Sequence, residues 1–360
     1  MEKKIQMMVG PTAIPHRVLK AMSRESISHR SKEYSIIQER ITSNLKKVFG
    51  TKQEVLLLTS SGTGAMESVI QNCFSSHDEI VVPIIGNFSE QFALMGEIYG
   101  LKVKRVKFEL GETADVGRVM KEVTVATKGV FVVHNESSTG VYNDLEAFGN
   151  AIKDTNALLI TDSVSGLGGL EMRMDEWHVD VALTSSQKAL MTPAGLAFVA
   201  LSEKAWSRVE ESKFPKHYFD YKKASKFNEI NQTLTTPAVY TVFAVDEALN
   251  MIFEEGLDNL YSRHRTNTEL IIKGVKEVGL KLFAKDEKFA SPTLTAVYAP
   301  GKSKYIVSEL AKKNIIVNGG LAPLDEDIFR VGTMGYVSEN DVIAFLYALK
   351  QVVKILRNSN

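Results

Sequence analysis

The chain has little of several features that mark particular classes of protein. It contains one cysteine, Cys73, among 360 residues. A disulfide framework or a cysteine-based metal cluster within one chain is therefore excluded, and we expect a reducing, cytoplasmic location and no metal centre. Lys and Arg together number 43, as do Asp and Glu, so the formal net charge is zero. No global electric field then favours nucleic acid or a membrane surface as a partner.

Long apolar runs are missing as well. No stretch approaches the roughly 18 to 20 apolar residues of a membrane span. The charged start, Met1-Glu2-Lys3-Lys4, is not followed by an apolar stretch, so it does not resemble a signal peptide. With 44% hydrophobic and 24% charged residues, the composition is that of an ordinary globular protein.

Short apolar runs alternate with helical stretches between about residues 50 and 200. The strand-like runs are 55–59, 79–83, 102–106, 129–133, 157–161, 179–183 and 195–201. This alternation predicts an α/β fold with a mainly parallel sheet flanked by helices. Residues 213–236 show little periodicity. The later part mixes strands with helices, the latter at 238–255, 259–278, 304–313 and 339–356. That mixture is typical of a small α+β domain.

A lysine and an aspartate follow two of these runs. Lys188 comes shortly after the run 179–183, and Asp162 ends the run 157–161. Ligands gather at the carboxyl ends of parallel strands. A lysine that forms a Schiff base and an aspartate that keeps a pyridine nitrogen protonated are what pyridoxal phosphate chemistry needs. Taken alone, Lys188 would be a surface lysine and Asp162 a helix N-cap. The small, uncharged neighbours of Lys188 should lower its pKa if it enters a site.

Two polar segments strengthen this hypothesis. The segment Ser60 to Glu67 bridges a strand end and a helix start with Gly62 and Gly64, and it offers free N–H groups to a phosphate. The alternative is a tight turn with an N-cap, and no Gly-Lys-Ser/Thr follows to make it a Walker loop. The run 134–140 adds polar residues after another strand, which indicates the edge of a site. His134 by itself favours a structural hydrogen bond.

Phe88 and Arg330 each have two interpretations. Phe88 follows a strand end at Gly86-Asn87, so it is either a core aromatic or a ring that stacks on a planar ligand. Arg330 lies in the otherwise apolar segment 328–331. Because arginine is seldom buried without a partner, we expect either an internal salt bridge or a substrate carboxylate.

In their order and spacing these segments resemble the class V aminotransferases, which are pyridoxal phosphate enzymes of fold type I. The closest branch is that of the alanine–glyoxylate and serine–pyruvate aminotransferases. The resemblance covers nearly the whole chain and rests on residues 9–12, 28–31, 61–67, 86–88, 134–140, 162–165, 185–188, 319–321 and 329–332. It implies a large cofactor-binding domain over 16–255, a small C-terminal domain over 256–360, and an N-terminal segment, 1–15, that lines the active site.

The resemblance also implies roles for individual residues. Lys188 would hold the cofactor and carry the proton, and Asp162 would pair with the pyridinium. The remaining cofactor-binding residues would be Ser61, Gly62, Thr63, Phe88, Thr139, Gln187 and Thr235. Among them Phe88 stacks on the ring, Thr139 lies near its hydroxyl, and Thr235 reaches the phosphate of the partner in a homodimer. Arg330 and Gly10 would bind the substrate.

Some positions depart from the family pattern. Phe88 stands where mammalian relatives have Trp, and Gln232 where many relatives have a Tyr that contacts the partner's phosphate. Val9 replaces a common Pro, and Thr333 a common His. The last three bear on the partner's phosphate site or on substrate choice.

The predicted activity is a ping-pong transfer of an amino group from alanine, serine or aspartate to glyoxylate or pyruvate. One alternative is a 2-aminoethylphosphonate–pyruvate transaminase, which needs further cationic groups. Another is a lyase such as a cysteine desulfurase, which needs a cysteine on a mobile loop, whereas Cys73 falls in a predicted helix. A non-enzymatic scaffold on the same fold would be expected to lack Lys188 or Asp162, and both are present.

Overall fold

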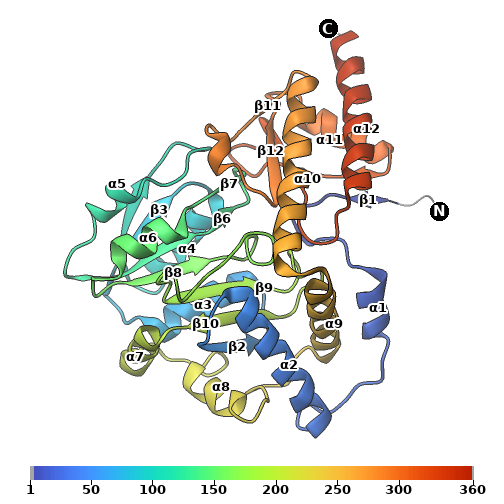
Figure 1. Ribbon diagram of the computed structural model, residues 1–360. Coiled ribbons are helices and arrows are strands. Elements are labelled where there is room, and N and C mark those ends of the chain that lie inside the picture. The colour runs from blue at the N-terminus through green and yellow to red at the C-terminus, as the bar shows by residue number, and fades with distance from the viewer. Residues whose placement is uncertain (1–3, 359–360) are drawn as a thin grey trace.

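A seven-stranded sheet forms the centre of the computed structural model, which describes residues 4–358 (Figure 1). Residues 1–3 and 359–360 of the predicted terminal segments therefore lie outside the described residues. The strand order is β2-β10-β9-β8-β5-β3-β4. Their bounds are β2 (Glu54–Leu58), β3 (Glu79–Ile84), β4 (Lys102–Lys107), β5 (Thr127–Val133), β8 (Leu158–Asp162), β9 (Val181–Ser185) and β10 (Ala197–Leu201). All neighbours pair in parallel except β10, which is antiparallel to both β2 and β9. The predicted mainly parallel sheet is confirmed.

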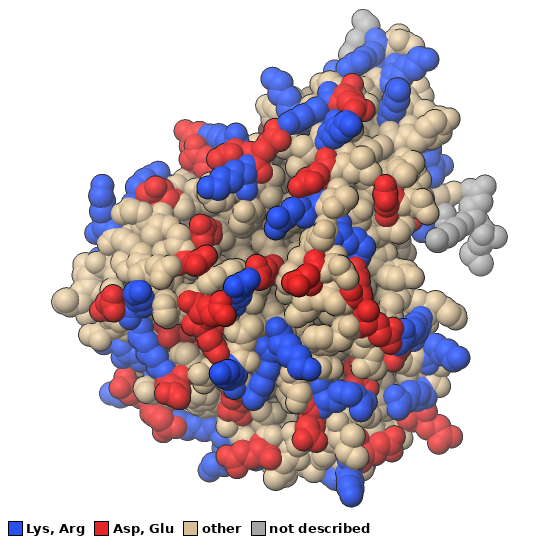
Figure 2. All heavy atoms as spheres, viewed as in Figure 1, with Lys and Arg blue, Asp and Glu red and all other residues tan. Residues whose placement is uncertain are grey.

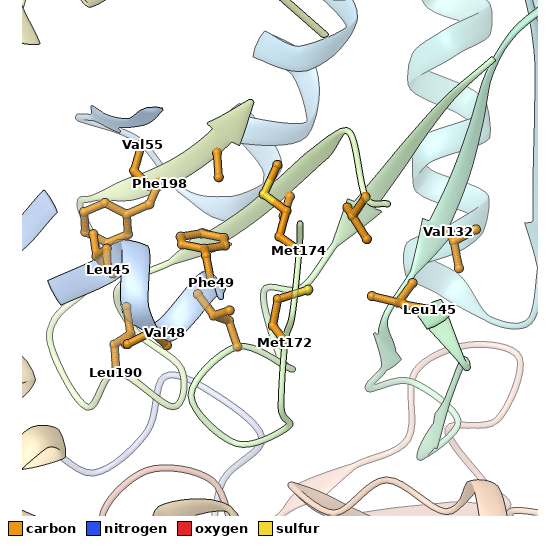
Figure 3. Packing of buried hydrophobic residues seen from close by; sticks show 14 of the residues in the cluster. Leu45, Val48, Phe49, Val55, Val132, Leu145, Met172, Met174, Leu190 and Phe198 are labelled. Atoms are coloured by element: carbon orange, nitrogen blue, oxygen red, sulfur yellow. The ribbon is translucent and has the colours of Figure 1, made fainter. Parts of the chain in front are cut away.

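Helices cover both faces of this sheet, which explains why its strands read as continuous apolar runs. Every residue of β8, β9 and β10 is buried. On one face lie α2 (Lys32–Phe49), α5 (Val116–Met120), α6 (Leu145–Ile152) and α9 (Val239–Glu255), and on the other α3 (Gly62–Cys73), α4 (Asn87–Ile98), α7 (Glu203–Glu211) and α8 (Tyr221–Asn228). Strand side chains alternate between the two cores: Val132 joins the first and Phe131 the second. Figure 3 shows the first core, where Phe49 of α2 lies near Phe198 of β10.

The C-terminal residues form a second sheet with its own core. Its order is β11-β12-β15-β14, all antiparallel, with β11 (Lys281–Leu282), β12 (Leu294–Tyr298), β14 (Asn318–Gly319) and β15 (Ile328–Gly332). The helices α10 (Leu257–Glu277), α11 (Ser303–Lys312) and α12 (Glu339–Asn358) lie beside it. Strand β1 (Ile5–Gln6) pairs in parallel with β13 (Ile315–Ile316), and Met7 joins the C-terminal core. The domain boundaries at residues 15 and 255 stay a prediction.

Some elements were not predicted from the sequence. Residues 213–236 lack helical periodicity, yet they contain α8, whose Tyr221 is fully buried and hydrogen-bonded to Ser68. Helix α1 (His16–Met22), the short pair β6 (Asn135–Glu136) and β7 (Val141–Tyr142), and the 3₁₀ turn η1 (Glu287–Phe289) complete the described elements. No helix within residues 4–358 is long and apolar enough to cross a membrane. On the face drawn in Figure 2, acidic and basic side chains are interspersed without a continuous stripe of one sign.

The topology brings the polar segments of the sequence to one edge of the sheet. Strands β2, β3, β5, β8 and β9 run in the same direction, so their carboxyl ends share that edge. Asp162 is the last residue of β8, and the segments that follow the other strands carry Ser61, Phe88, Thr139 and Lys188. Residues that are far apart in the chain are therefore neighbours in space.

The core beneath this edge predicts a large loss of stability for Phe131→Ala. The ring of Phe131 is fully buried between those of Phe74 and Phe92, at centroid distances of 5.2 and 4.9 Å. Truncating a buried phenylalanine costs about 3–5 kcal/mol because it removes apolar contact and leaves a cavity. We expect that loss in the free energy of unfolding of the cofactor-free protein, measured in urea. Ile98→Ala, at a side chain that is 80% exposed, should cost less than about 0.5 kcal/mol. Equal effects of the two substitutions would contradict the packing described.

Candidate active site

Lys188 lies in the connection between β9 and β10, where the N-terminal segment holds it. Its Nζ donates a hydrogen bond to the carbonyl of Val9, at 2.6 Å. Thr12 bonds to the same stretch, because its hydroxyl donates to the Lys188 carbonyl at 2.8 Å and its N–H to the Gln187 carbonyl at 3.0 Å. Gly10 has a φ of +121°, and a Cβ there would lie 2.5 Å from Nζ of Lys188. Only glycine leaves room for the end of the lysine.

Burial shifts the pKa values of Lys188 and Asp162 toward each other. Burial and the charge of Arg330 together lower the pKa of Lys188 to about 8, and the charge of Asp162 opposes this shift. Burial raises the pKa of Asp162 to about 7, although its carboxylate accepts the N–H of Val164 at 2.8 Å. A larger fraction of the lysine is then neutral and nucleophilic near neutral pH. The ionised form of Asp162 would be stabilised by a cationic partner, and a protonated pyridine nitrogen is such a partner.

The start of α3 meets both of these strand ends. The side chain of Ser61 caps the helix by accepting the N–H of Gly64 at 3.3 Å. A Cβ on Gly62 would lie 2.5 Å from the side chain of Val164 and 3.3 Å from Oγ of Ser185. This close approach brings the free N–H groups of a twelve-residue helix beside the segment that follows Asp162. Thr63 is exposed in the first turn of the same helix.

The loops after β3 and β5 form the next part of the site. Phe88 is half-buried, and its N–H donates to the carboxylate of Glu136 at 3.1 Å. Thr139 is buried, and its hydroxyl donates to the Ile85 carbonyl at 3.2 Å. His134 has the structural hydrogen bond that the sequence favoured, at 2.8 Å between its Nδ1 and Oγ of Ser163. Burial lowers the pKa of His134 to about 3, so its imidazole is neutral.

Arg330 lies on β15 with a side chain that is 7% exposed. Its Nε donates to the Gly319 carbonyl at 2.9 Å and its Nη1 to the Ser137 carbonyl at 3.0 Å. Within residues 4–358 no carboxylate forms an ion pair with it, so the internal salt bridge considered from the sequence is absent there. Burial lowers the pKa of the guanidinium, and the charge of Glu136 opposes that shift. Donors of this planar group remain available to an anion.

Thr235 lines a small cavity beside Leu58 and Thr59 at the end of β2. Its carbonyl accepts the hydroxyl of Thr233 at 2.7 Å, and no described hydrogen bond joins it to Lys188 or to the start of α3. The side chain of Gln232 is held by Arg30, whose Nη1 donates to its Oε1 at 3.1 Å. The contact of Thr235 with a partner's phosphate stays a prediction.

Sequence reasoning missed two residues that the structure places here. Oγ of Ser185 is buried without a hydrogen-bond partner within residues 4–358, and it lies beside Gly62. Glu136 is completely buried. A buried acid within the polar run 134–140 was the available signal, since acids are rarely buried without partners. Of the two departures Val9 and Thr333, Val9 contacts Lys188 through its backbone carbonyl, whereas Thr333 is buried and bonded to Thr268.

Comparison with known proteins decides the family. The model described as "Aminotransferase class-V" matches residues 7–345. The chain belongs to the class V aminotransferases. It is 35% identical to the serine–glyoxylate aminotransferase of Methylorubrum extorquens, over 92% of this chain and 86% of that protein. It is also 37% identical to a protein of Anabaena cylindrica named soluble hydrogenase 42 kDa subunit, over 100% and 96% of the two chains. The crystal structure of an alanine–glyoxylate aminotransferase from Nostoc superposes with a TM-score of 0.93 at 28% identity, covering 98% of this chain and 96% of that one.

Membership of this aminotransferase family implies pyridoxal phosphate, and the residues present fit that group. Two buried polar atoms without hydrogen-bond partners in the described chain, Oγ of Ser185 and Oε1 of Gln187, lie at or near the lysine segment. A phosphate at the start of α3 could accept a hydrogen bond from the hydroxyl of Ser185, whereas Oε1 of Gln187 is an acceptor and only the NH2 of that amide could donate to it. Asp162 is a buried carboxylate that a pyridinium would neutralise.

The lowered pKa of Lys188 predicts how the attachment of the cofactor depends on pH. Below a pKa of about 8 the amine is mostly protonated and cannot attack an aldehyde, and above it the amine is mostly neutral. The rate of covalent attachment to the cofactor-free aminotransferase should rise about tenfold from pH 6 to 7 and level off above about pH 9. Borohydride trapping followed by mass spectrometry of the Lys188 peptide measures this rate. Lys188→Arg gives the background rate of labelling at other lysines. A midpoint of the pH–rate curve near 10.5, the ordinary pKa of lysine, would contradict the burial of Lys188.

Proposed function

We propose that this aminotransferase uses pyridoxal phosphate to move an amino group from a small amino acid to a 2-oxo acid by a ping-pong mechanism. The donor would be alanine, serine or aspartate, and the acceptor glyoxylate or pyruvate. The observation that carries the proposal is Arg330, a buried guanidinium with no carboxylate in ion-pair contact within residues 4–358. Its charge lowers the pKa of Lys188, so a carboxylate bound by Arg330 would lie near the reacting amine.

Several residues would hold the cofactor together with Lys188. Asp162 would pair with its ring nitrogen, Phe88 would stack on its ring, and Thr139 would lie near its hydroxyl. The phosphate would be bound by Ser61, Gly62, Thr63, Ser185 and Gln187, with Thr235 of a second subunit completing the site in a homodimer. When bound, the cofactor supplies an aldehyde that accepts the amino group and a ring that withdraws electrons.

Lys188 and Arg330 would divide the remaining work. With a pKa of about 8, Lys188 can accept a proton from the Cα of the substrate and return it near neutral pH. Arg330 would orient the substrate through its carboxylate. Amino acids and 2-oxo acids both carry that carboxylate, so one site can serve donor and acceptor in turn. A ping-pong mechanism requires such a shared position, because donor and acceptor occupy the site one after the other.

The substrate proposal draws on relatives that are named serine–glyoxylate and alanine–glyoxylate aminotransferases. Both names pair a small amino donor with glyoxylate. A cysteine desulfurase is disfavoured because Cys73 is buried at the end of α3, and burial raises the pKa of its thiol to about 12. Such a thiol is neither exposed nor ionised near neutral pH, whereas a sulfur acceptor must be both.

Lys188→Ala tests the reaction class. It should lower turnover by at least about a thousandfold, because it removes both the anchor of the cofactor and the proton carrier. Turnover is measured as the formation of glycine from glyoxylate, or of alanine from pyruvate, across a panel of amino donors. An unchanged melting temperature of the cofactor-free variant would show that it still folds. Normal turnover by this variant would refute the proposed function.

Arg330→Lys tests the carboxylate site. A lysine keeps the positive charge but loses the planar pair of donors, so substrate affinity should fall. We expect KM to rise about 10- to 100-fold for donor and acceptor alike, with a smaller change in kcat. Steady-state kinetics with both substrates measure the split. An increase confined to one substrate would show that the two do not share this site.

A further inference from the structure

Glu136 is a completely buried acid that the proposed chemistry does not use. It lies on β6, and within residues 4–358 it forms no ion pair with a lysine, arginine or histidine. Burying a carboxylate is costly unless other groups replace its hydration. The groups that replace the hydration of Glu136 therefore indicate which part of the structure this residue holds in place.

The carboxylate of Glu136 accepts hydrogen bonds from the first turn of α4. The N–H groups of Phe88 and Ser89 donate to it at 3.1 and 3.0 Å. The N-terminus of a helix favours an anion through its dipole and its free N–H groups. This carboxylate therefore caps α4 from a different strand and fixes the backbone of Phe88.

Ser138 completes the cap. Its hydroxyl donates to Glu136 at 2.6 Å and accepts the N–H of Asn87 at 2.9 Å, while its own N–H donates to the same carboxylate at 3.2 Å. A Cβ on Gly86 would lie 2.4 Å from Oγ of Ser138 and 2.5 Å from Cγ of Glu136. The loop before α4 therefore lies directly against these two side chains.

Arg330 lies on the other side of the same segment. Its Nη1 donates to the carbonyl of Ser137, the residue between Glu136 and Ser138, at 3.0 Å. The negative charge of Glu136 favours the charged form of Arg330. The oxygens of Glu136 are taken by α4 and Ser138, so it provides this charge without occupying the guanidinium.

We propose that Glu136 is a positioning residue that fixes the ring of Phe88 against the cofactor while it leaves Arg330 free for the substrate carboxylate. The inference rests on the proposed function, which assigns Phe88 and Arg330 to cofactor and substrate. Glu136 itself touches neither and acts through the N–H groups of α4.

The test is a double-mutant cycle on pyridoxal phosphate binding to the cofactor-free chain. Glu136→Gln removes the charge and places amide hydrogens among N–H donors, so we expect the dissociation constant to rise at least about tenfold. Phe88→Ala should also weaken binding, and the double variant should bind no more than about twofold weaker than the weaker single variant. The matched control is Glu90→Gln, which makes the same change on the same helix at a residue paired with Arg105. It should stay within about twofold of the wild type.

A second measurement separates positioning from a general structural role. Propionate binding to the cofactor-loaded protein, followed by the absorbance of the cofactor, should be as tight in Glu136→Gln as in the wild type, or tighter. Arg330 keeps its carbonyl partners in this variant and loses a compensating negative charge. Loss of both cofactor and propionate affinity, or additive effects of the Glu136 and Phe88 substitutions, would overturn the proposal.

If Glu136→Gln does not fold, Glu136→Asp serves in the same cycle, because it keeps the charge but shortens the reach to α4. A wild-type chain that fails to bind pyridoxal phosphate would refute the proposed function. A chain that binds it normally but shows additive effects refutes the role of Glu136 alone.

Discussion

The desolvation of charged groups at one edge of the main sheet is the constraint on which the site depends. Asp162, Arg330 and Glu136 are buried there and Lys188 is half-buried, and the described chain provides few opposite charges in contact with them. Each is instead supported by carbonyl or N–H groups of neighbouring segments. Such a cluster is costly in the free protein and would become favourable if it bound a phosphate, a pyridinium and a substrate carboxylate as proposed. The charged groups of the site thus do not neutralise one another, and the proposed ligands would supply the missing opposite charges.

The fold was largely predictable because its signals are local. Continuous apolar runs separated by helices specify a parallel sheet covered on both faces, and the carboxyl-edge rule then locates the site. Helix α8 was not predictable in this way, because only Tyr221 and Ala224 of its eight residues are buried, and the hydroxyl of Tyr221 is hydrogen-bonded to Ser68. The antiparallel direction of β10 could not be read from the residues either, since a buried strand looks the same in both directions.

The residues of the site could be predicted from the sequence better than the hydrogen bonds that hold them. Asp162 ends one strand, and Lys188 and the start of α3 follow two others, so their proximity comes from topology. The bond between Lys188 and the carbonyl of Val9 depends on backbone atoms, which leave no trace in residue type. The buried position of Glu136 depends on the N–H groups of a helix that begins 49 residues earlier at Asn87. Because these partners are backbone groups far away in the chain, the role of Glu136 could not be predicted from the motif in which it lies.

The antiparallel return of β10 beside β9 has a consequence for the lysine. The connection that carries Lys188 starts and finishes on paired neighbours, since Ser185 lies opposite Ala197. Within it, the N–H of Ser186 donates to the Leu196 carbonyl at 2.9 Å, and the hydroxyl of Thr192 donates to the Ser186 carbonyl at 2.8 Å. The entropy cost of ordering this connection is thus met once, when the chain folds. Each catalytic cycle then begins with the amine already confined, and substrate binding energy is not needed to restrict it.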